Sequence, residues 1–114
     1  MDNAYKYNIK PVETKISPYI DEDSMICGWN VKVVFQGDIQ SLFKQPDLMQ
    51  KYDLSPDGSE LSCRMGYDSI KNTTVANFLF KLDSLPGQAR RRALNFKNKI
   101  QSQISASKRN ENTK

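Results

Sequence analysis

Every second residue from 25 to 35 is apolar in the stretch MICGWNVKVVFQ (residues 25–36), and this regularity constrains the fold more than any other feature. The residues between them are much more polar and include Gly28, Asn30, Lys32 and Gln36. A two-residue period places one set of side chains on a core and the other towards water. Such one-sided strands are typical of antiparallel sheets. We therefore expect a long strand whose core face carries Met25, Cys27, Trp29, Val31, Val33 and Phe35.

Further strands are expected on both sides of this one. Residues 4–16 alternate at first, and Pro11 indicates that their strand lies at a sheet edge or ends near that residue, because proline cannot donate a ladder hydrogen bond. Residues 17–24 form a polar connection with three acids, and residues 60–67 alternate again. Residues 74–82 fit a strand or a helix. Their Thr and Phe content and the short link to the preceding strand favour a hairpin, with the helix as the alternative.

Two segments have helical signals. Asp38 can cap a short helix, and Pro46 can open a second turn, so residues 37–58 predict a helical crossover. From residue 88 to residue 104 the apolar residues recur every three or four positions, which predicts an amphipathic helix. These apolar residues are Ala89, Ala93, Phe96, Ile100 and Ile104. Residues 105–114 have almost no apolar side chains and predict a disordered polar tail.

The combined prediction is an α+β fold. We expect a three- or four-stranded, mostly antiparallel sheet, with a short helical crossover and a basic amphipathic C-terminal helix packed on one face. The helix should press Ala89, Ala93, Phe96 and Ile100 onto the apolar face of residues 29–35. Residues 1–104 should form a single small domain, as suits a chain of 114 residues. The order of the strands stays open.

Composition argues against ordinary catalysis. The chain has no histidine, which removes the usual general base and excludes Ser–His and Cys–His nucleophile pairs. Two cysteines, Cys27 and Cys63, lie on apolar strand faces and are expected in the core, where they form neither a disulfide scaffold nor a zinc site. The glycines form no nucleotide-binding loop. The acids of residues 21–23 are expected to be a solvated loop. We therefore expect no enzyme, no metal and no cofactor.

Charge is distributed unevenly along the chain. Residues 1–85 carry nine basic and twelve acidic residues, whereas residues 86–114 carry eight basic residues and one acid, Glu111. A basic segment on a mildly acidic body favours nucleic acid or an acidic protein as partner. Arginine forks match phosphate geometry. The candidate contact residues on the C-terminal helix are Arg90, Arg91, Arg92, Lys97 and Lys99.

Lys6 and Lys10 complete the candidate interface, because they alternate with Tyr5 and Tyr7 on the first expected strand. Basic and aromatic side chains interleaved on a sheet can bind single-stranded nucleic acid. The plainer interpretation places both tyrosines in the core, and a charged helix face can simply be solvated. A continuous positive band that joins the helix to Lys6, Lys10 and Lys32 would favour nucleic acid, whereas an isolated patch beside an apolar groove would favour a protein.

The functional hypothesis is a small, non-enzymatic binding or regulatory protein that contacts DNA or RNA through its basic helix. The alternative is a protein-interaction module, such as an adaptor, assembly factor or inhibitor, that docks on an acidic protein. A third hypothesis is an enzyme that uses lysine, tyrosine or carboxylates. The N-terminus lacks the pattern of a signal peptide, and no apolar run could span a bilayer. We therefore expect a soluble, cytoplasmic protein.

Overall fold

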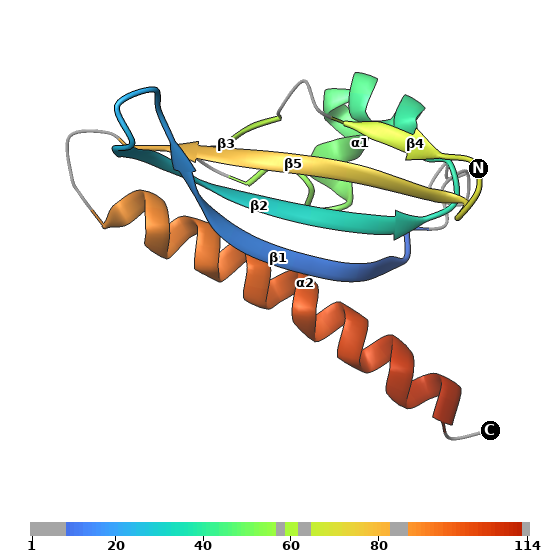
Figure 1. Ribbon diagram of the computed structural model, residues 1–114. Coiled ribbons are helices and arrows are strands. Elements are labelled where there is room, and N and C mark those ends of the chain that lie inside the picture. Colours follow the sequence, from blue (N-terminus) through green and yellow to red (C-terminus); the bar gives the residue numbers. More distant parts are fainter. Residues whose placement is uncertain (1–8, 57–58, 62–64, 83–86, 113–114) are drawn as a thin grey trace.

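The computed structural model describes residues 9–56, 59–61, 65–82 and 87–112. They form a small single α+β domain (Figure 1). The elements are β1 (Pro11–Ile20), β2 (Ile26–Gln36), the 3₁₀ helix η2 (Gln40–Lys44), α1 (Pro46–Lys51), β3 (Ser59–Leu61), β4 (Gly66–Asp68), β5 (Thr73–Lys81) and α2 (Gln88–Asn112).

The strands form one sheet in the order β1-β2-β5-β3, and every neighbouring pair is antiparallel. β4 also pairs with β5, further along the strand edge that β3 occupies. The five strand segments therefore fill four positions across the sheet. The expected α+β fold with an antiparallel sheet is confirmed, and the ambiguous stretch of residues 74–82 belongs to a strand, β5.

The two central strands, β2 and β5, bury one face from Val31 to Phe35 and from Thr74 to Phe80. Val31 lies opposite Phe78, and Val33 lies opposite Ala76. All four side chains are at most 1% exposed, whereas the residues between them are half-buried on the other face. The alternation of residues 29–35 therefore predicted the core face correctly.

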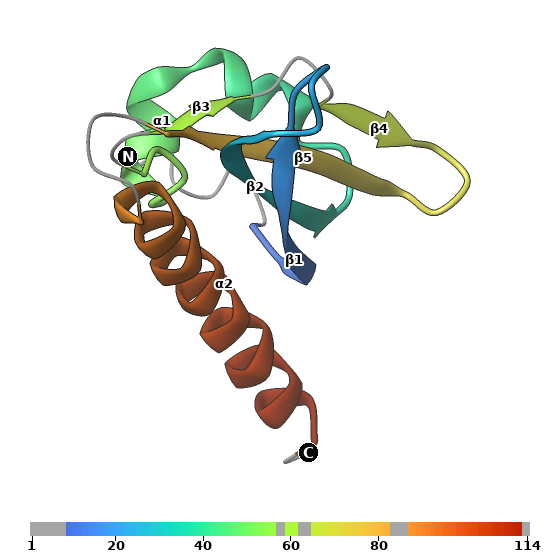
Figure 2. The same ribbon diagram turned by 60° about the vertical axis from the view of Figure 1, so that its left-hand side comes forward.

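Both helical segments cover this same face and share one aromatic core. The ring of Phe43 from η2 lies 5.9 Å from Phe35 of β2 and 6.4 Å from Phe78 of β5. The ring of Phe96 from α2 lies 4.8 Å from Phe78 in an edge-to-face arrangement. The apolar stripe of α2 is buried as expected, from Ala89 to Ile104. Figure 2 shows that the C-terminal end of α2 extends beyond the sheet.

The first strand lies later in the chain than predicted, and its expected place at a sheet edge is confirmed. β1 begins at Pro11 rather than ending near it, and it includes residues 17–20, which were expected to be a connection. Residues 4–8 lie outside the described part of the chain. The strand extends because β2 offers partners as far as Ile26, which lies opposite Ile20. β1 is an edge strand, where Pro11 and Pro18 are tolerated and hinder pairing with a further strand.

The buried face of β2 starts later than the sequence suggests. The pairing is irregular between Tyr19 and Ile20, so that Cys27 falls between the pairs Tyr19–Gly28 and Ile20–Ile26. Met25 lies before the strand and is 64% exposed, and Cys27 is only half-buried. The expectation that both belong to the core is wrong, because the bulge ends the alternation. Cys63 lies outside the described residues.

Helix α2 ends later than expected. It runs to Asn112, whereas the sequence predicted a disordered tail from residue 105. Adding residues to a helix that is already docked requires no new nucleation, and residues 105–112 contain no Gly or Pro to stop it. The last buried side chain of the helix is nevertheless Ile104.

Candidate nucleic-acid interface

Outside its buried stripe, α2 carries only positive charge over most of its length. Packing of the stripe from Ala89 to Ile104 on the sheet leaves Arg90, Arg91 and Lys99 exposed, and Arg92 and Lys97 half-buried. No acid occurs between Gly87 and Glu111, so no acid within the helix offsets these five residues before that point. Opposite charges three or four residues apart stabilise a helix, and α2 has no such pair between Gly87 and Glu111 that would offset its basic residues.

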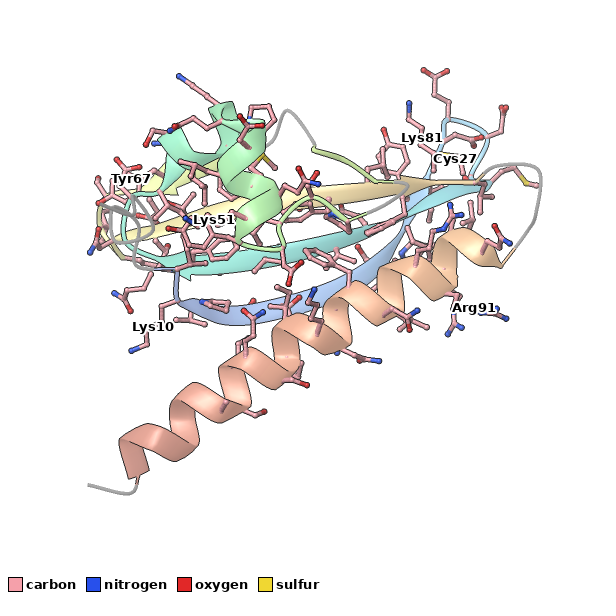
Figure 3. All side chains as sticks on the ribbon, turned by 180° about the vertical axis from the view of Figure 1, so that it is seen from behind. Lys10, Cys27, Lys51, Tyr67, Lys81 and Arg91 are labelled. Carbon is pink, nitrogen blue, oxygen red and sulfur yellow. The ribbon has the colours of Figure 1, made fainter. Side chains whose placement is uncertain are left out.

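Arg90 is held by an aromatic ring. Its guanidinium carbon lies 5.5 Å from the centroid of the Trp29 ring, and Trp29 is half-buried near the start of β2. This cation–π contact ties the first turn of α2 to the sheet. Arg91, by contrast, forms no ion pair with any residue that the structure describes, and Figure 3 shows its side chain directed away from the sheet. The three adjacent arginines therefore have different surroundings.

A pocket of about 430 Å³ lies between α2 and the segment that follows α1. It is lined by Gln50, Asp53, Ser55, Pro56, Arg92, Asn95, Phe96 and Lys99. The Nζ atom of Lys99 lies 2.8 Å from a carboxylate oxygen of Asp53, and both side chains are about half exposed. An Nη atom of Arg92 donates a hydrogen bond to Oε1 of Gln88 at 3.4 Å. Two of the five basic residues thus have protein acceptors within reach.

The sequence analysis named Arg92 and Lys99 as charges on α2 but predicted no pocket. Arg92, Asn95 and Lys99 follow one another at intervals of three and four residues, so helical spacing alone places them on one side of α2. Asp53 gave no such signal, because it comes from a distant part of the chain. It has a positive φ of 60° just after α1, and this turn brings its carboxylate to the helix.

Lys10 and Lys32 do not extend the positive surface of α2 across the sheet. Lys6 lies outside the described residues. Lys10 precedes β1, and Figure 3 shows it near the opposite end of the sheet from Arg91. Lys32 lies between Val31 and Val33 on β2 and therefore points to the face that α2 does not cover. A positive band that includes Lys32 is absent from the described surface.

The acidic residues 21–23 form the tip of the β1–β2 hairpin. One carboxylate oxygen of Asp21 accepts hydrogen bonds from the backbone N–H groups of Asp23 and Met25, each at 2.9 Å. Asp21 therefore closes the turn, which also needs the positive φ of 62° at Ser24. Nowhere in residues 9–56, 59–61, 65–82 and 87–112 do three or more His, Cys, Asp or Glu side chains gather as metal ligands.

Comparison of the chain with known protein families, with curated proteins and with solved structures finds no match. Within the described residues, no helix is long and apolar enough to cross a lipid bilayer. The functional argument therefore depends on the chemistry of the described surface.

Proposed function

We propose that the protein binds nucleic acid through the outward side of α2. The observation that carries this proposal is the run of five basic residues, Arg90 to Lys99, on a docked helix with no acid before Glu111. Lysine and arginine that neutralise phosphates release bound counterions, which supplies most of the affinity of non-specific binding. The interface consists of the candidate residues on α2, while Lys10 is peripheral and Lys6 lies outside the described residues.

The shape of the helix supports the proposal. α2 has 25 residues, which corresponds to about 37 Å. That length spans several phosphates along a duplex or a single strand. The five basic residues lie in the half of α2 that packs on the sheet, and the helix continues past its last buried side chain, Ile104, away from the strands (Figures 1 and 2).

Fluorescence anisotropy with labelled duplex DNA, single-stranded DNA and RNA tests the proposal. Affinity should fall steeply as salt rises from about 50 to about 200 mM, because each neutralised phosphate releases a counterion. Arg91→Gln with Lys97→Gln removes two charges from α2, and Lys15→Gln with Lys32→Gln removes two from outside it. Each pair combines one exposed and one half-buried residue.

The two double variants should differ although their net charges are equal. The α2 variant should weaken binding about tenfold and lower the salt slope by about two, whereas the sheet variant should bind nearly as the unmodified protein does. Equal weakening in both variants would mean that only net charge matters, and no binding at low salt would reject the proposal.

An acidic protein is the second candidate, and one observation favours it. The positive surface does not continue to Lys32, and Lys99 already binds a carboxylate, that of Asp53. This hypothesis expects a partner that remains bound after nuclease treatment and is lost when Arg91 is changed to Glu. Binding of polyglutamate with no binding of DNA or RNA would favour it over nucleic acid.

A further inference from the structure

Large apolar side chains gather at one end of the sheet, around the tip of the β1–β2 hairpin. The described residues include seven exposed large apolar side chains, and five of them lie at this end. These five are Tyr19 (47% exposed), Ile20 (54%), Met25 (64%), Ile26 (46%) and Leu82 (38%). We call this group the hairpin patch. Apolar side chains that cluster on a surface mark an interaction site more often than scattered ones do.

Hydrogen bonds hold the hairpin patch in place. Ile20 lies opposite Ile26 in the sheet, whereas Tyr19 lies opposite Gly28, on the face that α2 does not cover, and so borders the hairpin patch from that face. The backbone N–H of Met25 donates to Asp21, and the backbone N–H of Leu82 donates to the carbonyl of Cys27 at 3.1 Å. The side chains are therefore presented by a formed hairpin, which lowers the entropic cost of binding through them.

Opposite charges lie on the two sides of the hairpin patch. Glu22 and Asp23 lie beyond it at the hairpin tip, and both are exposed. Arg91 lies on the other side, at the start of α2. Figure 3 shows Cys27, Lys81 and Arg91 at the same end of the molecule. No described residue forms an ion pair with Glu22, Asp23 or Arg91.

We propose that the hairpin patch binds a second copy of this chain in a two-fold symmetric dimer. A two-fold axis through the patch places apolar side chains of one protomer on those of the other. The same axis brings the acidic tip of each protomer to Arg91 of its partner, so that each dimer contains the acid–arginine contact twice. The charges on this end are thus complementary to themselves, which argues for a second copy over an unrelated partner.

The dimer is expected to be weak. The patch has only five side chains per protomer, whereas stable interfaces involve roughly 20–30 residues on each side. We expect a dissociation constant on the order of micromolar, with dimer favoured at low salt because its rim contacts are ionic. Sedimentation velocity between about 1 µM and about 1 mM covers this range, and the monomer mass is 13.1 kDa.

A matched pair of substitutions tests the apolar part. Ile20→Thr should raise the dissociation constant about tenfold, since it removes apolar surface from the interface. Ile70→Thr is the control, because Ile70 is 94% exposed and lies in the β4–β5 turn, away from the hairpin. Both changes keep a β-branched side chain. A protein that stays monomeric throughout, or equal effects of the two variants, would overturn the proposal.

Mixing two charge variants tests the symmetric arrangement. Glu22→Lys with Asp23→Lys makes the tip basic, and Arg91→Glu makes the start of α2 acidic, so each variant alone should lose the dimer through like charges. Mixed in equal amounts, they should form a heterodimer, because both contacts then join opposite charges. Failure of the mixture to dimerise would reject the two-fold arrangement. These measurements contain no nucleic acid, so they succeed or fail independently of the proposed function.

Discussion

The guanidinium of Arg90 lies over the indole ring of Trp29, with 5.5 Å between its central carbon and the ring centroid. This contact joins the first turn of α2 to β2, near the start of that strand. A cation over an aromatic ring contributes about 0.5–1 kcal/mol at a partly exposed site. One of the three adjacent arginines therefore contributes to the fold, and the sequence alone could not distinguish it from its neighbours.

Arg90→Ala should lower the free energy of unfolding by about 0.5–1 kcal/mol, because it removes the contact with Trp29. Urea unfolding followed by tryptophan fluorescence measures this directly, since Trp29 is the one tryptophan of the chain. Arg91→Ala serves as the control and should stay within about 0.5 kcal/mol of the unmodified protein. Equal losses in both variants would show that the ring contact is not the cause.

Gly28→Ala should destabilise the sheet. A methyl group at Gly28 would lie 2.8 Å from the carbonyl oxygen of Phe80 and 3.3 Å from Cα of Lys81, and both are backbone atoms that cannot turn aside. We expect a loss of about 1–3 kcal/mol in denaturant unfolding. Gly66→Ala is the matched control, because no atom lies within 4 Å of its added methyl group. A neutral effect at Gly28 would contradict the close pairing of β2 with β5.

Periodicity predicted the fold where it was long and uninterrupted. Val31, Val33 and Phe35 alternate over a full strand, and the stripe of α2 repeats over several turns, so both buried faces were predicted correctly. The first strand was placed too early because Pro11 can begin an edge strand as well as end one. Which residues β2 pairs with depends on contacts between distant parts of the chain, and local alternation does not contain that information.

Thr74→Val should destabilise the protein although it preserves the shape of the side chain. Thr74 is fully buried, and its hydroxyl donates to the carbonyl of Gly37 at 2.6 Å and accepts from the N–H of Ile39 at 3.0 Å. Valine would leave both backbone groups without this partner, at a cost of about 1–3 kcal/mol. Thr73→Val, on the half-buried face, should change stability by less than about 0.5 kcal/mol. Thermal unfolding of the two variants compares them, and similar midpoints would refute the assignment.

The candidate interface was only partly predictable. Composition alone identified the basic segment, and helical spacing separated its charges from the buried stripe. The ion pair of Lys99 with Asp53 was not predictable, because a turn with positive φ brings Asp53 to α2 from the other side of the fold. The sequence also did not indicate the hairpin patch. Cys27 and Met25 continue the alternation of β2 in sequence, but Cys27 lies at the bulge and Met25 lies beyond it, where its side chain is exposed.

Asp53→Asn should strengthen binding of nucleic acid if α2 is the interface. The substitution removes a carboxylate 2.8 Å from Nζ of Lys99 and leaves the lysine available to a phosphate. Asparagine tolerates the positive φ of 60° at this position, so the turn should persist. We expect affinity to rise about two- to fivefold at low salt, with the gain fading as salt increases.

Glu13→Gln is the matched control, because it also removes one negative charge and releases a lysine, Lys15, from a contact at 3.8 Å on the edge strand β1. Anisotropy titrations of the two variants against the same labelled duplex distinguish an effect of the charge beside Lys99 from an effect of the net charge of the protein. A gain confined to Asp53→Asn assigns binding to α2, whereas an equal gain with Glu13→Gln would show that the nucleic acid responds only to net charge.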